Sequence, residues 1–411
     1  MKLLHTADWH LNDRLGPVDR TDHLRRRVEE VARICRDESV DVLVIAGDLF
    51  SERAEVSSRV NQVADSFRHL RKTFAEFFAG GGIVLGVTGN HDQDGRVRPY
   101  LELARAGMDI TAPPLSRGGH FQPGKLYLLD AAFVGRVRDT REGFDVQFAL
   151  IPFTPLSRIQ TGAETASTAA ELNRPVAANV ADRIRDLPNQ PGYDANLRTV
   201  LVAHAHVTGA DVGKGTFRVS ESSDVILDAA ALPSGFDYVA LGHIHRYQCI
   251  RDLEHICYSG SLDRMDFGES GEKKGIVLVD IGPDGRRGNP RFVEIEATPL
   301  VEATITNAAT AAAEIATQVN DPTAAVVRVT VEALAAEAGS AVDLTIRDSL
   351  PNVASVTRRA IESVAAPAAL AGGTVRERVL EYLAACVDAS DPQRADLIRL
   401  ASDFLDREGH R

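Results

Sequence analysis

The chain has 411 residues, of which 44% are hydrophobic and 25% are charged, and its formal net charge is −12. The composition is typical of a globular protein, and the length exceeds that of one ordinary hydrophobic core, so we expect two or three domains. The negative charge argues against a protein that coats nucleic acid through bulk positive charge. No run of about 18 apolar residues is present, so we expect no membrane-spanning helix.

The four cysteines are Cys35, Cys249, Cys257 and Cys386, and their spacing is not that of a thiolate metal site. Only Cys249 and Cys257 lie near each other, and a strand or hairpin explains both as small core residues. The opening segment turns polar after two leucines, too early for a signal peptide. We therefore expect a protein of the reducing cytoplasm.

Residues 1–297 alternate short apolar runs with helical stretches. The apolar runs are residues 2–6, 40–46, 83–88, 132–137, 148–151, 199–203, 238–241 and 275–280. Each run is short and β-branched, with Gly, Asn or Asp at its end, which is typical of the buried strands of an α/β sandwich. We expect one domain over this range.

Two helices are predicted among these strands, at residues 25–38 and 56–78. In the second helix, apolar side chains recur at steps of three and four residues and form one stripe. The stripe consists of Val56, Val60, Val63, Phe67, Leu70 and Phe74. It is explained equally by packing against the core and by a dimer surface.

A second region begins near residue 298, where the pattern changes. A strand-like segment at residues 301–306, an alanine-rich helix at 308–319 and a strand at 324–331 follow one another. We expect a small α+β capping domain over residues 298–364.

The end of the chain is predicted to be a terminal helical pair in residues 375–411. A linker rich in Ala, Gly and Pro precedes it at residues 365–374. Residues 375–387 and 394–407 have the pattern of amphipathic helices. Two isolated helices bury little surface by themselves, so we expect this pair to dock on a partner.

Five of the predicted strands are followed directly by His, Asp or Asn. These segments are Asp8-Trp9-His10, Gly47-Asp48, Gly89-Asn90-His91-Asp92, His204-Ala205-His206 and Gly242-His243-Ile244-His245. One such residue alone is usually a helix cap or a satisfied polar group. Five together indicate a site, because functional loops of α/β sheets gather at the carboxyl ends of the strands. Burying so many polar groups without hydrogen-bond partners or ligands would destabilise the fold by roughly several kcal/mol.

Metal ions explain this cluster, since imidazole, carboxylate and amide ligands together suit Mn²⁺, Fe²⁺ or Zn²⁺. Asp8 and His10 are two residues apart, so in an extended segment they point to the same side and can bind one ion. His243 and His245 have the same spacing and can each reach a different ion. A carboxylate such as Asp48 can bridge two ions that lie roughly 3.5–4 Å apart. The further candidate ligands are Asn90 and His204.

The motifs D-x-H, G-D, G-N-H-D, a strand-end H and G-H-x-H, in this order, resemble those of the calcineurin-like metallophosphoesterase superfamily. The resemblance spans residues 8–245 and implies a four-layer α/β/β/α sandwich with two divalent metal ions. It implies that one ion is bound by Asp8, His10, Asp48 and His245. It implies that the second ion is bound by Asp48, Asn90, His204 and His243.

The same resemblance implies a catalytic pair. His91 is similar to the histidine that stabilises the transition state or protonates the leaving oxygen. Its usual partner is the acid beside it, here Asp92, which can fix the tautomer of the ring. His206 lies close to His204 in sequence, but the residue that follows the strand directly matches the ligand better, so we assign His204.

Three features resemble the SbcD family, the bacterial counterpart of the double-strand-break repair nuclease. They are LLHTADWHLN together with GDLF, the string YSGSLDRMDFGE at residues 258–269, and the C-terminal extension. The resemblance implies a Mn²⁺-dependent DNA nuclease with 3′-to-5′ exonuclease and single-strand endonuclease activity. Some relatives carry a histidine shortly after G-D-x-F, where this chain has Ser51-Glu52-Arg53, so the resemblance does not extend to a second catalytic histidine.

The resemblance also implies partners. The C-terminal helices would dock on an SbcC-type ABC/SMC-like ATPase, which must supply any ATP hydrolysis because the chain has no G-x-x-x-x-G-K-S/T loop. It further implies a homodimer through residues 56–78, DNA as the substrate and a nucleoid-associated location in the cytoplasm. Arg246 and Arg264 are candidate contacts to DNA phosphates, with a surface role unconnected with DNA as the alternative.

Two other functions are compatible with these motifs. A small-molecule phosphodiesterase of the same superfamily would share every metal ligand, but it would leave the C-terminal extension without a purpose. A non-catalytic scaffold that tethers DNA would have no need of the ligands, and none of them is missing here.

Overall fold

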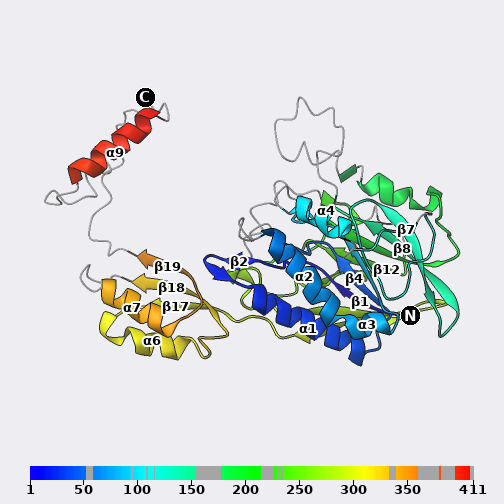
Figure 1. Cartoon of the computed structure of the whole chain (residues 1–411), viewed down its shortest axis with the longest axis horizontal. Helices are drawn as coiled ribbons and strands as arrows, with labels where there is room; N and C mark the ends of the chain where they lie inside the picture. Colours follow the sequence, from blue (N-terminus) through cyan, green and yellow to red (C-terminus); the bar gives the residue numbers. More distant parts are fainter. Residues whose placement is uncertain are drawn as a thin grey trace.

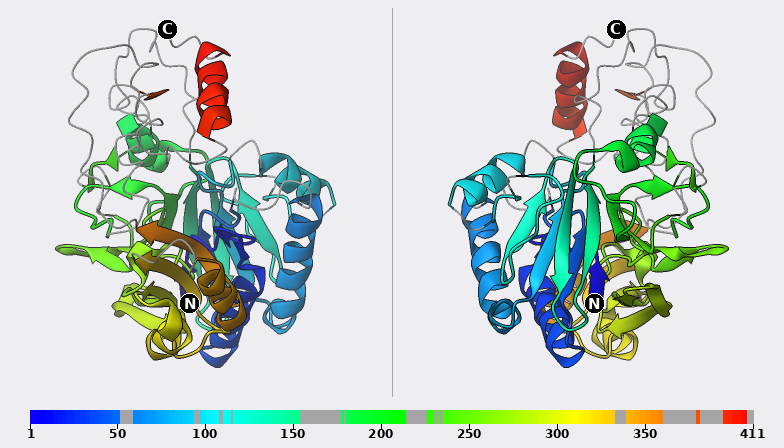
Figure 2. Two further views of the ribbon diagram at one scale, coloured as in Figure 1. Left: turned by 90° about the vertical axis from the view of Figure 1, so that its left-hand side faces the viewer. Right: turned by 90° about the vertical axis from the view of Figure 1, so that its right-hand side faces the viewer.

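The computed structural model describes residues 1–51, 59–93, 97–107, 110–114, 116–153, 177–178, 180–213, 226–229, 232, 235–332, 339–359, 379–380 and 394–407. Within these ranges, two six-stranded sheets lie in the N-terminal part, and a three-stranded sheet with its own helices follows (Figure 1). In the turned views of Figure 2, the blue helices near the N-terminus lie along one flank of the stacked sheets.

The first sheet has the strand order β16-β15-β1-β4-β5-β6. Its strands are β1 (Lys2–Thr6), β4 (Val42–Ala46), β5 (Ile83–Val87), β6 (Leu126–Leu129), β15 (Lys274–Gly282) and β16 (Gly285–Ile295). The strands β1, β4, β5 and β6 are parallel, and the other two are antiparallel to their neighbours. Because both faces of the sheet are covered, β4 and β5 are buried along their whole length and are continuous apolar runs in the sequence.

The second sheet has the strand order β13-β14-β12-β9-β8-β7. Its strands are β7 (Phe133–Asp139), β8 (Phe144–Ile151), β9 (Arg198–His204), β12 (Tyr238–Gly242), β13 (Gln248–Ile250) and β14 (Leu253–Tyr258). The four central strands are parallel, and β7 and β13 are antiparallel edges. The sequence analysis missed β6, β13, β14 and β16, whose apolar runs are short or interrupted by polar residues.

The two sheets pack against each other through one apolar layer, which includes Val44 and Leu85 from the first sheet and Phe148 and Val202 from the second. The outer face of the first sheet is covered by α1 (Thr21–Asp37), α2 (Arg59–Thr73), α3 (Ala75–Ala79) and α4 (Arg98–Ala106). Helical residues 180–185 pack on the outer face of the second sheet. The predicted α/β/β/α sandwich is therefore confirmed.

The helix predicted at residues 56–78 is observed from Arg59 onward as α2 and α3. The described apolar members of its stripe are Val63, Phe67, Leu70 and Phe74. They are at most 4% exposed and pack into the core beneath the first sheet. Core packing is thus the correct interpretation for these four side chains, which are not available as a dimer surface. Val56 lies outside the described residues.

A smaller unit follows the sandwich. It contains β17 (Leu300–Ile305), α6 (Ala311–Gln318), β18 (Val326–Glu332), α7 (Gly339–Ser349) and β19 (Val353–Arg359). The three strands are parallel, and the helices pack on them through a separate apolar core. The expected β-α-β pattern is present, and a further α-β unit extends it. No sequence pattern indicated β19, because that strand is mostly exposed and lacks an apolar run.

The terminal helix predicted at residues 394–407 is observed as α9 (Arg394–Arg407). The predicted linker at residues 365–374 lies outside the described residues, as does the preceding helix apart from residues 379–380. The domain boundaries at residues 297, 364 and 374 therefore stay predictions.

Cys249 and Cys257 lie in the expected strand context, on β13 and β14, but the sequence analysis did not foresee that they form a disulfide. They lie directly opposite each other on the antiparallel strands β13 and β14, with their Cα atoms 4.0 Å apart. This register brings the two sulfurs together, and it removes the support that cysteine usage lent to a reducing compartment. Within the described ranges, no helix has the length and apolar character needed to cross a membrane.

Phe148→Ala is expected to lower the free energy of unfolding by about 3–5 kcal/mol, because truncating a ring buried between the two sheets leaves a cavity. Urea denaturation followed by circular dichroism measures this change. Val356→Ala, on an exposed position of β19, serves as the control and is expected to change stability by less than about 0.5 kcal/mol. Equal effects of the two substitutions would contradict the place of Phe148 in the core.

Candidate metal centre

The loops that follow β1, β4, β5, β9 and β12 meet at one edge of the stacked sheets, where backbone hydrogen bonds join them. Asp8 N donates to Gly47 O at 3.0 Å, and His10 N donates to Asp48 O at 3.0 Å. Across the two sheets, His243 N donates to the Asp8 carboxylate at 3.1 Å. The predicted ligands of all five loops are therefore brought together in space.

The backbone of these loops is strained. Five non-glycine residues of these loops have positive φ, namely Asp8 (51°), His10 (43°), Asn12 (66°), Asp48 (50°) and His243 (98°). L-residues rarely adopt this left-handed region, and each such residue costs roughly 1–3 kcal/mol. Four of the five are predicted metal ligands, so the strain is concentrated where these side chains converge.

Two glycines of the motifs are required because their backbone lies very close to a neighbouring loop. A Cβ at Gly89 would lie 2.0 Å from Asp48 Oδ1, and a Cβ at Gly242 would lie 1.8 Å from Ala46 O. Any side chain at either position would push the loops apart. The glycines that open G-N-H-D and G-H-x-H therefore serve to bring the loops within reach of one another.

The donor atoms of the cluster lie close together. His10 Nε2 is 3.2 Å from His245 Nε2, and His204 Nε2 is 3.3 Å from Asp48 Oδ2. Asn90 Oδ1 lies 2.9 Å from His204 Nε2 and 3.2 Å from His243 Nδ1. Among the described residues, three groups have all their ligand atoms within 4.8 Å of one another. They are Asp8, His10 and His245; His10, Asp48 and His91; and Asp8, Asp48 and His204.

The chemistry of these donors fits divalent cations. His204 Nδ1 lies 2.9 Å from Ala46 O, a carbonyl that can only accept, so a neutral His204 directs the Nε2 lone pair toward the Asp48 carboxylate. The lone pair and the carboxylate repel each other unless a proton or a cation lies between them. Asp8 and Asp48 are at most 1% exposed, which makes an uncompensated pair of carboxylates costly.

The pKa values of the cluster reflect this need for positive charge. Burial lowers the pKa of His204, but the carboxylates of Asp48 and Asp8 outweigh burial and raise it to about 9. Burial also raises the pKa of Asp8, whereas the imidazoles around Asp48 overcome burial and hold its pKa well below the usual range. In the metal-free protein a proton on His204 thus supplies the charge, and metal binding would displace it.

His91 and His206 occupy different places relative to the cluster. The ring of His91 stands edge-on to that of His10 with centroids 4.8 Å apart, and His91 Nε2 lies 3.9 Å from Asp48 Oδ2. The ring of His206 lies 6.4 Å from that of His243. Neither His206 nor the predicted ligand His243 belongs to the three ligand groups of the described residues, whereas His204 does. This geometry favours His204 over His206 as the ligand.

Asp92 has a different role from the one expected. Its carboxylate accepts hydrogen bonds from the backbone N–H groups of Leu49 (3.1 Å), Phe50 (3.0 Å) and Gly89 (2.9 Å). Burial raises the pKa of Asp92 to about 7, and the negative charge of Asp48 adds to this effect. These contacts tie the G-D loop to the G-N-H-D loop, and they replace the expected pairing of Asp92 with the His91 ring.

The two arginines proposed for DNA phosphates are engaged with the protein. Arg264 Nη1 donates to Thr298 O at 3.1 Å, and its other nitrogens donate to Glu272 O. This arginine therefore joins two backbone segments, and its role as a phosphate contact stays a prediction. Arg246 is partly exposed and pairs with Asp211 at 2.6 Å, which is a surface ion pair that a phosphate can displace.

The sequence analysis missed Glu269 and Lys274, which lie directly behind His245. Burial would raise the pKa of Glu269, but Lys274 and His245 beside it hold that pKa well below its usual range. Glu269 is the last residue of the motif YSGSLDRMDFGE at residues 258–269. This motif is the feature of the sequence from which Glu269 could have been identified. Nothing in it indicated which of its residues faces the metal ligands.

Comparison with curated proteins finds several bacterial nuclease subunits. The chain is 29% identical to the SbcD subunit of the SbcCD nuclease of Rhodobacter capsulatus over 294 residues, which cover 68% of this chain and 66% of that protein. It is 24% identical to the corresponding Bacillus subtilis protein, covering 69% and 67%, and 25% identical to the Escherichia coli protein, covering 68% and 64%. The chain thus matches about two thirds of the length of these relatives.

Solved structures with some likeness include a dimetal phosphatase from Danio rerio, at 14% identity and a TM-score of 0.38, covering 72% of this chain and 99% of that one. A purple acid phosphatase from yellow lupin has 11% identity and a TM-score of 0.35, covering 72% and 53%. The evidence for the fold is therefore the arrangement of the two sheets and not these structural similarities. The family model of the calcineurin-like phosphoesterases matches residues 1–247. The chain therefore belongs to the calcineurin-like phosphoesterase family.

Proposed function

We propose that this chain is a metal-dependent DNA nuclease that hydrolyses phosphodiester bonds at DNA ends during repair, as the nuclease subunit of an SbcCD-like complex. The observation that carries the proposal is the buried cluster of carboxylate, imidazole and amide acceptors in a chain of the phosphoesterase family. The similarity to three SbcCD nuclease subunits supports DNA as the substrate. Exonuclease and endonuclease activities, and the partners, belong to the proposal through the resemblance of the sequence motifs.

Two divalent cations belong to the proposed site. The ligand set suits Mn²⁺, Fe²⁺ or Zn²⁺, and Mn²⁺ is proposed from the family resemblance. One would be held by Asp8, His10, Asp48 and His245, and the other by Asp48, Asn90, His204 and His243. When bound, such ions activate water and neutralise charge on the phosphate. The short distances from His10 to His245 and from His204 to Asp48 support this division.

His91 is the proposed catalytic residue of the chain itself. Its side chain is 15% exposed beside the ligand cluster, so a substrate phosphate can approach it from outside. Its imidazole would donate a proton to the leaving 3′-oxygen or a hydrogen bond to the transition state. Asp92 would support this role indirectly, because it anchors the loop that carries His91.

Exposed apolar side chains support the proposed partners. Leu397 and Leu400 on α9 are 45% and 61% exposed, as expected if residues 375–411 dock on an SbcC-type ATPase. Leu103 on α4 is 59% exposed, and α4 packs beside α2, so this surface is available for the proposed homodimer in place of the buried stripe. The proposed setting is the nucleoid in the cytoplasm.

Asp48→Asn is expected to weaken Mn²⁺ binding at both positions by more than about 100-fold. The loss of a direct ligand should exceed the roughly 10–100-fold that the loss of an outer-sphere partner usually costs. The reason is that one carboxylate is proposed to bridge both ions. Isothermal titration calorimetry and the metal content of the purified protein measure the effect. Asp284→Asn, in the exposed turn between β15 and β16, is the control. Two ions bound to Asp48→Asn with unchanged affinity would rule out the bridge.

End-labelled duplex and single-stranded DNA should be shortened by the wild-type chain in Mn²⁺, and chelation by EDTA should abolish this activity. His91→Ala is expected to reduce the cleavage rate by roughly 10²–10⁴-fold, the usual contribution of a general acid, while Mn²⁺ binding persists. His120→Ala, whose ring is half exposed and paired with Asp145, is the control histidine.

Failure to cleave DNA would distinguish between the two alternative functions, a small-molecule phosphodiesterase and a scaffold. If the chain leaves DNA intact but hydrolyses a small aryl phosphodiester in a metal-dependent manner, the substrate is a small molecule. If it binds DNA and cleaves neither substrate, it is a scaffold.

A further inference from the structure

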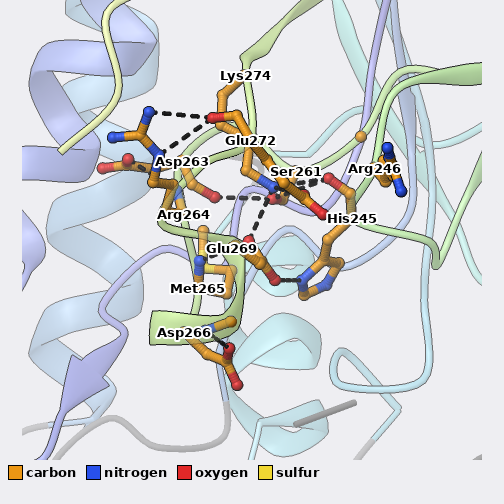
Figure 3. A network of polar contacts seen from close by, with 12 residues as sticks. His245, Arg246, Ser261, Asp263, Arg264, Met265, Asp266, Glu269, Glu272 and Lys274 are labelled. Carbon is orange, nitrogen blue, oxygen red and sulfur yellow. Dashed lines mark hydrogen bonds and ion pairs between the residues drawn. The ribbon is translucent and has the colours of Figure 1, made fainter. Parts of the chain in front are cut away.

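A buried cluster of charged side chains contacts His245 (Figure 3). Its members are Glu269, which is 3% exposed, and Lys274, which is 1% exposed. We propose that Glu269 is a positioning residue that fixes the tautomer and orientation of His245 for one metal ion, and that Lys274 holds Glu269 and His245 together. The inference rests on the proposed metal site and extends it to two residues outside the ligand set.

The contact between Glu269 and His245 determines which ring nitrogen faces the site. His245 Nδ1 lies 3.0 Å from Glu269 Oε1, and His245 Nε2 lies 3.2 Å from His10 Nε2. An ionised carboxylate can only accept, so the imidazole proton resides on Nδ1. The lone pair on Nε2 is then directed toward His10, where it can bind a cation.

Glu269 is in turn held in place by two donors. Its second oxygen, Oε2, accepts from Met265 N at 2.9 Å and pairs with Lys274 Nζ at 2.8 Å. Glu269 ends the short helical turn η6 (Phe267–Glu269), whose N-cap Asp266 accepts a hydrogen bond from Gly268 N. The carboxylate thus has one oxygen for the histidine and one for its own anchors.

Lys274 closes the arrangement into a ring. Its ammonium group, at the start of β15, pairs with Glu269, donates to His245 O at 2.8 Å and donates to Glu272 Oε2 at 3.1 Å. These three acceptors match the three donors of an ammonium group. The side chain and the main chain of His245 are therefore fixed by the same buried ion pair, which restricts rotation of the imidazole.

A second histidine of the cluster shows why the effect should be confined to one ion. His204 Nδ1 lies 2.9 Å from the backbone carbonyl of Ala46, which no substitution removes. His245 instead depends on a side chain that can be replaced. Loss of Glu269 is therefore expected to weaken the ion shared by Asp8, His10 and His245, and to spare the ion near His204.

The test is Mn²⁺ titration of the full-length protein, followed by calorimetry and by electron paramagnetic resonance of free Mn²⁺. Glu269→Ala is expected to weaken one of two Mn²⁺ sites by about 10–100-fold, the usual cost of an outer-sphere partner, with the other site unchanged. In Glu269→Gln the amide oxygen is expected to stay with its donors Met265 N and Lys274, which turns the amide NH2 group toward Nδ1, so a loss at the same site is expected.

Glu272→Gln is the matched control, because Glu272 contacts Lys274 without contacting a metal ligand. It should leave both Mn²⁺ sites at wild-type affinity. Melting temperatures in EDTA reveal any loss of folding, and Glu269→Gln carries the test if Glu269→Ala is unfolded.

Wild-type affinity at both sites in the Glu269 variants would overturn the proposal and leave a purely structural ion pair. Equal weakening of both sites would also overturn it, because general destabilisation affects both ions alike. A wild-type chain that binds no Mn²⁺ would refute the proposed metal site itself, a failure that is recognisable before any variant is compared.

Discussion

The candidate site depends on the face-to-face packing of two sheets. Asp8, Asp48 and Asn90 follow strands of the first sheet, whereas His204 ends one strand of the second sheet and His243 follows another. A displacement of one sheet by a single residue, roughly 3.3 Å, would separate these side chains. The close-packed apolar layer between the sheets prevents such a displacement, so the same core stabilises the fold and sets the distances within the site.

The loops at this edge have backbone conformations that their residues rarely adopt. Asp8 and His243 both have positive φ, and a hydrogen bond between His243 N and the Asp8 carboxylate joins them across the sheets. Such strain persists only where the surroundings over-determine the conformation. Here the surroundings are two mixed sheets whose parallel strands end at the same edge, together with glycines that allow the loops to approach.

The charged groups around the site divide into two kinds. The carboxylates of Asp8 and Asp48 face the ligand cluster, while those of Asp92 and Glu269 bind backbone N–H groups or Lys274. The first pair creates a demand for positive charge at the centre. The second pair holds the ligand loops in position. Lys274 does not meet that demand, because its ammonium group is committed behind His245.

Much of the sandwich and of the candidate ligand set followed from local pattern. Apolar runs predicted most of the central strands, and the rule that functional loops follow parallel strands selected Asp8, Asp48, Asn90 and His204 from the sequence. These features are predictable because strand length, residue type and the position of a residue after its strand are properties of a short segment.

Tertiary structure alone decided which partners these residues have. Asp92 binds the backbone of Leu49 and Phe50 in another loop, and Arg264 binds the carbonyl oxygen of Thr298. Cys249 meets Cys257 because of the register of two strands. Sequence specifies what a side chain can bind, but the partner that it does bind depends on which distant segments pack beside it. That packing is a property of the whole core, and no single segment encodes it.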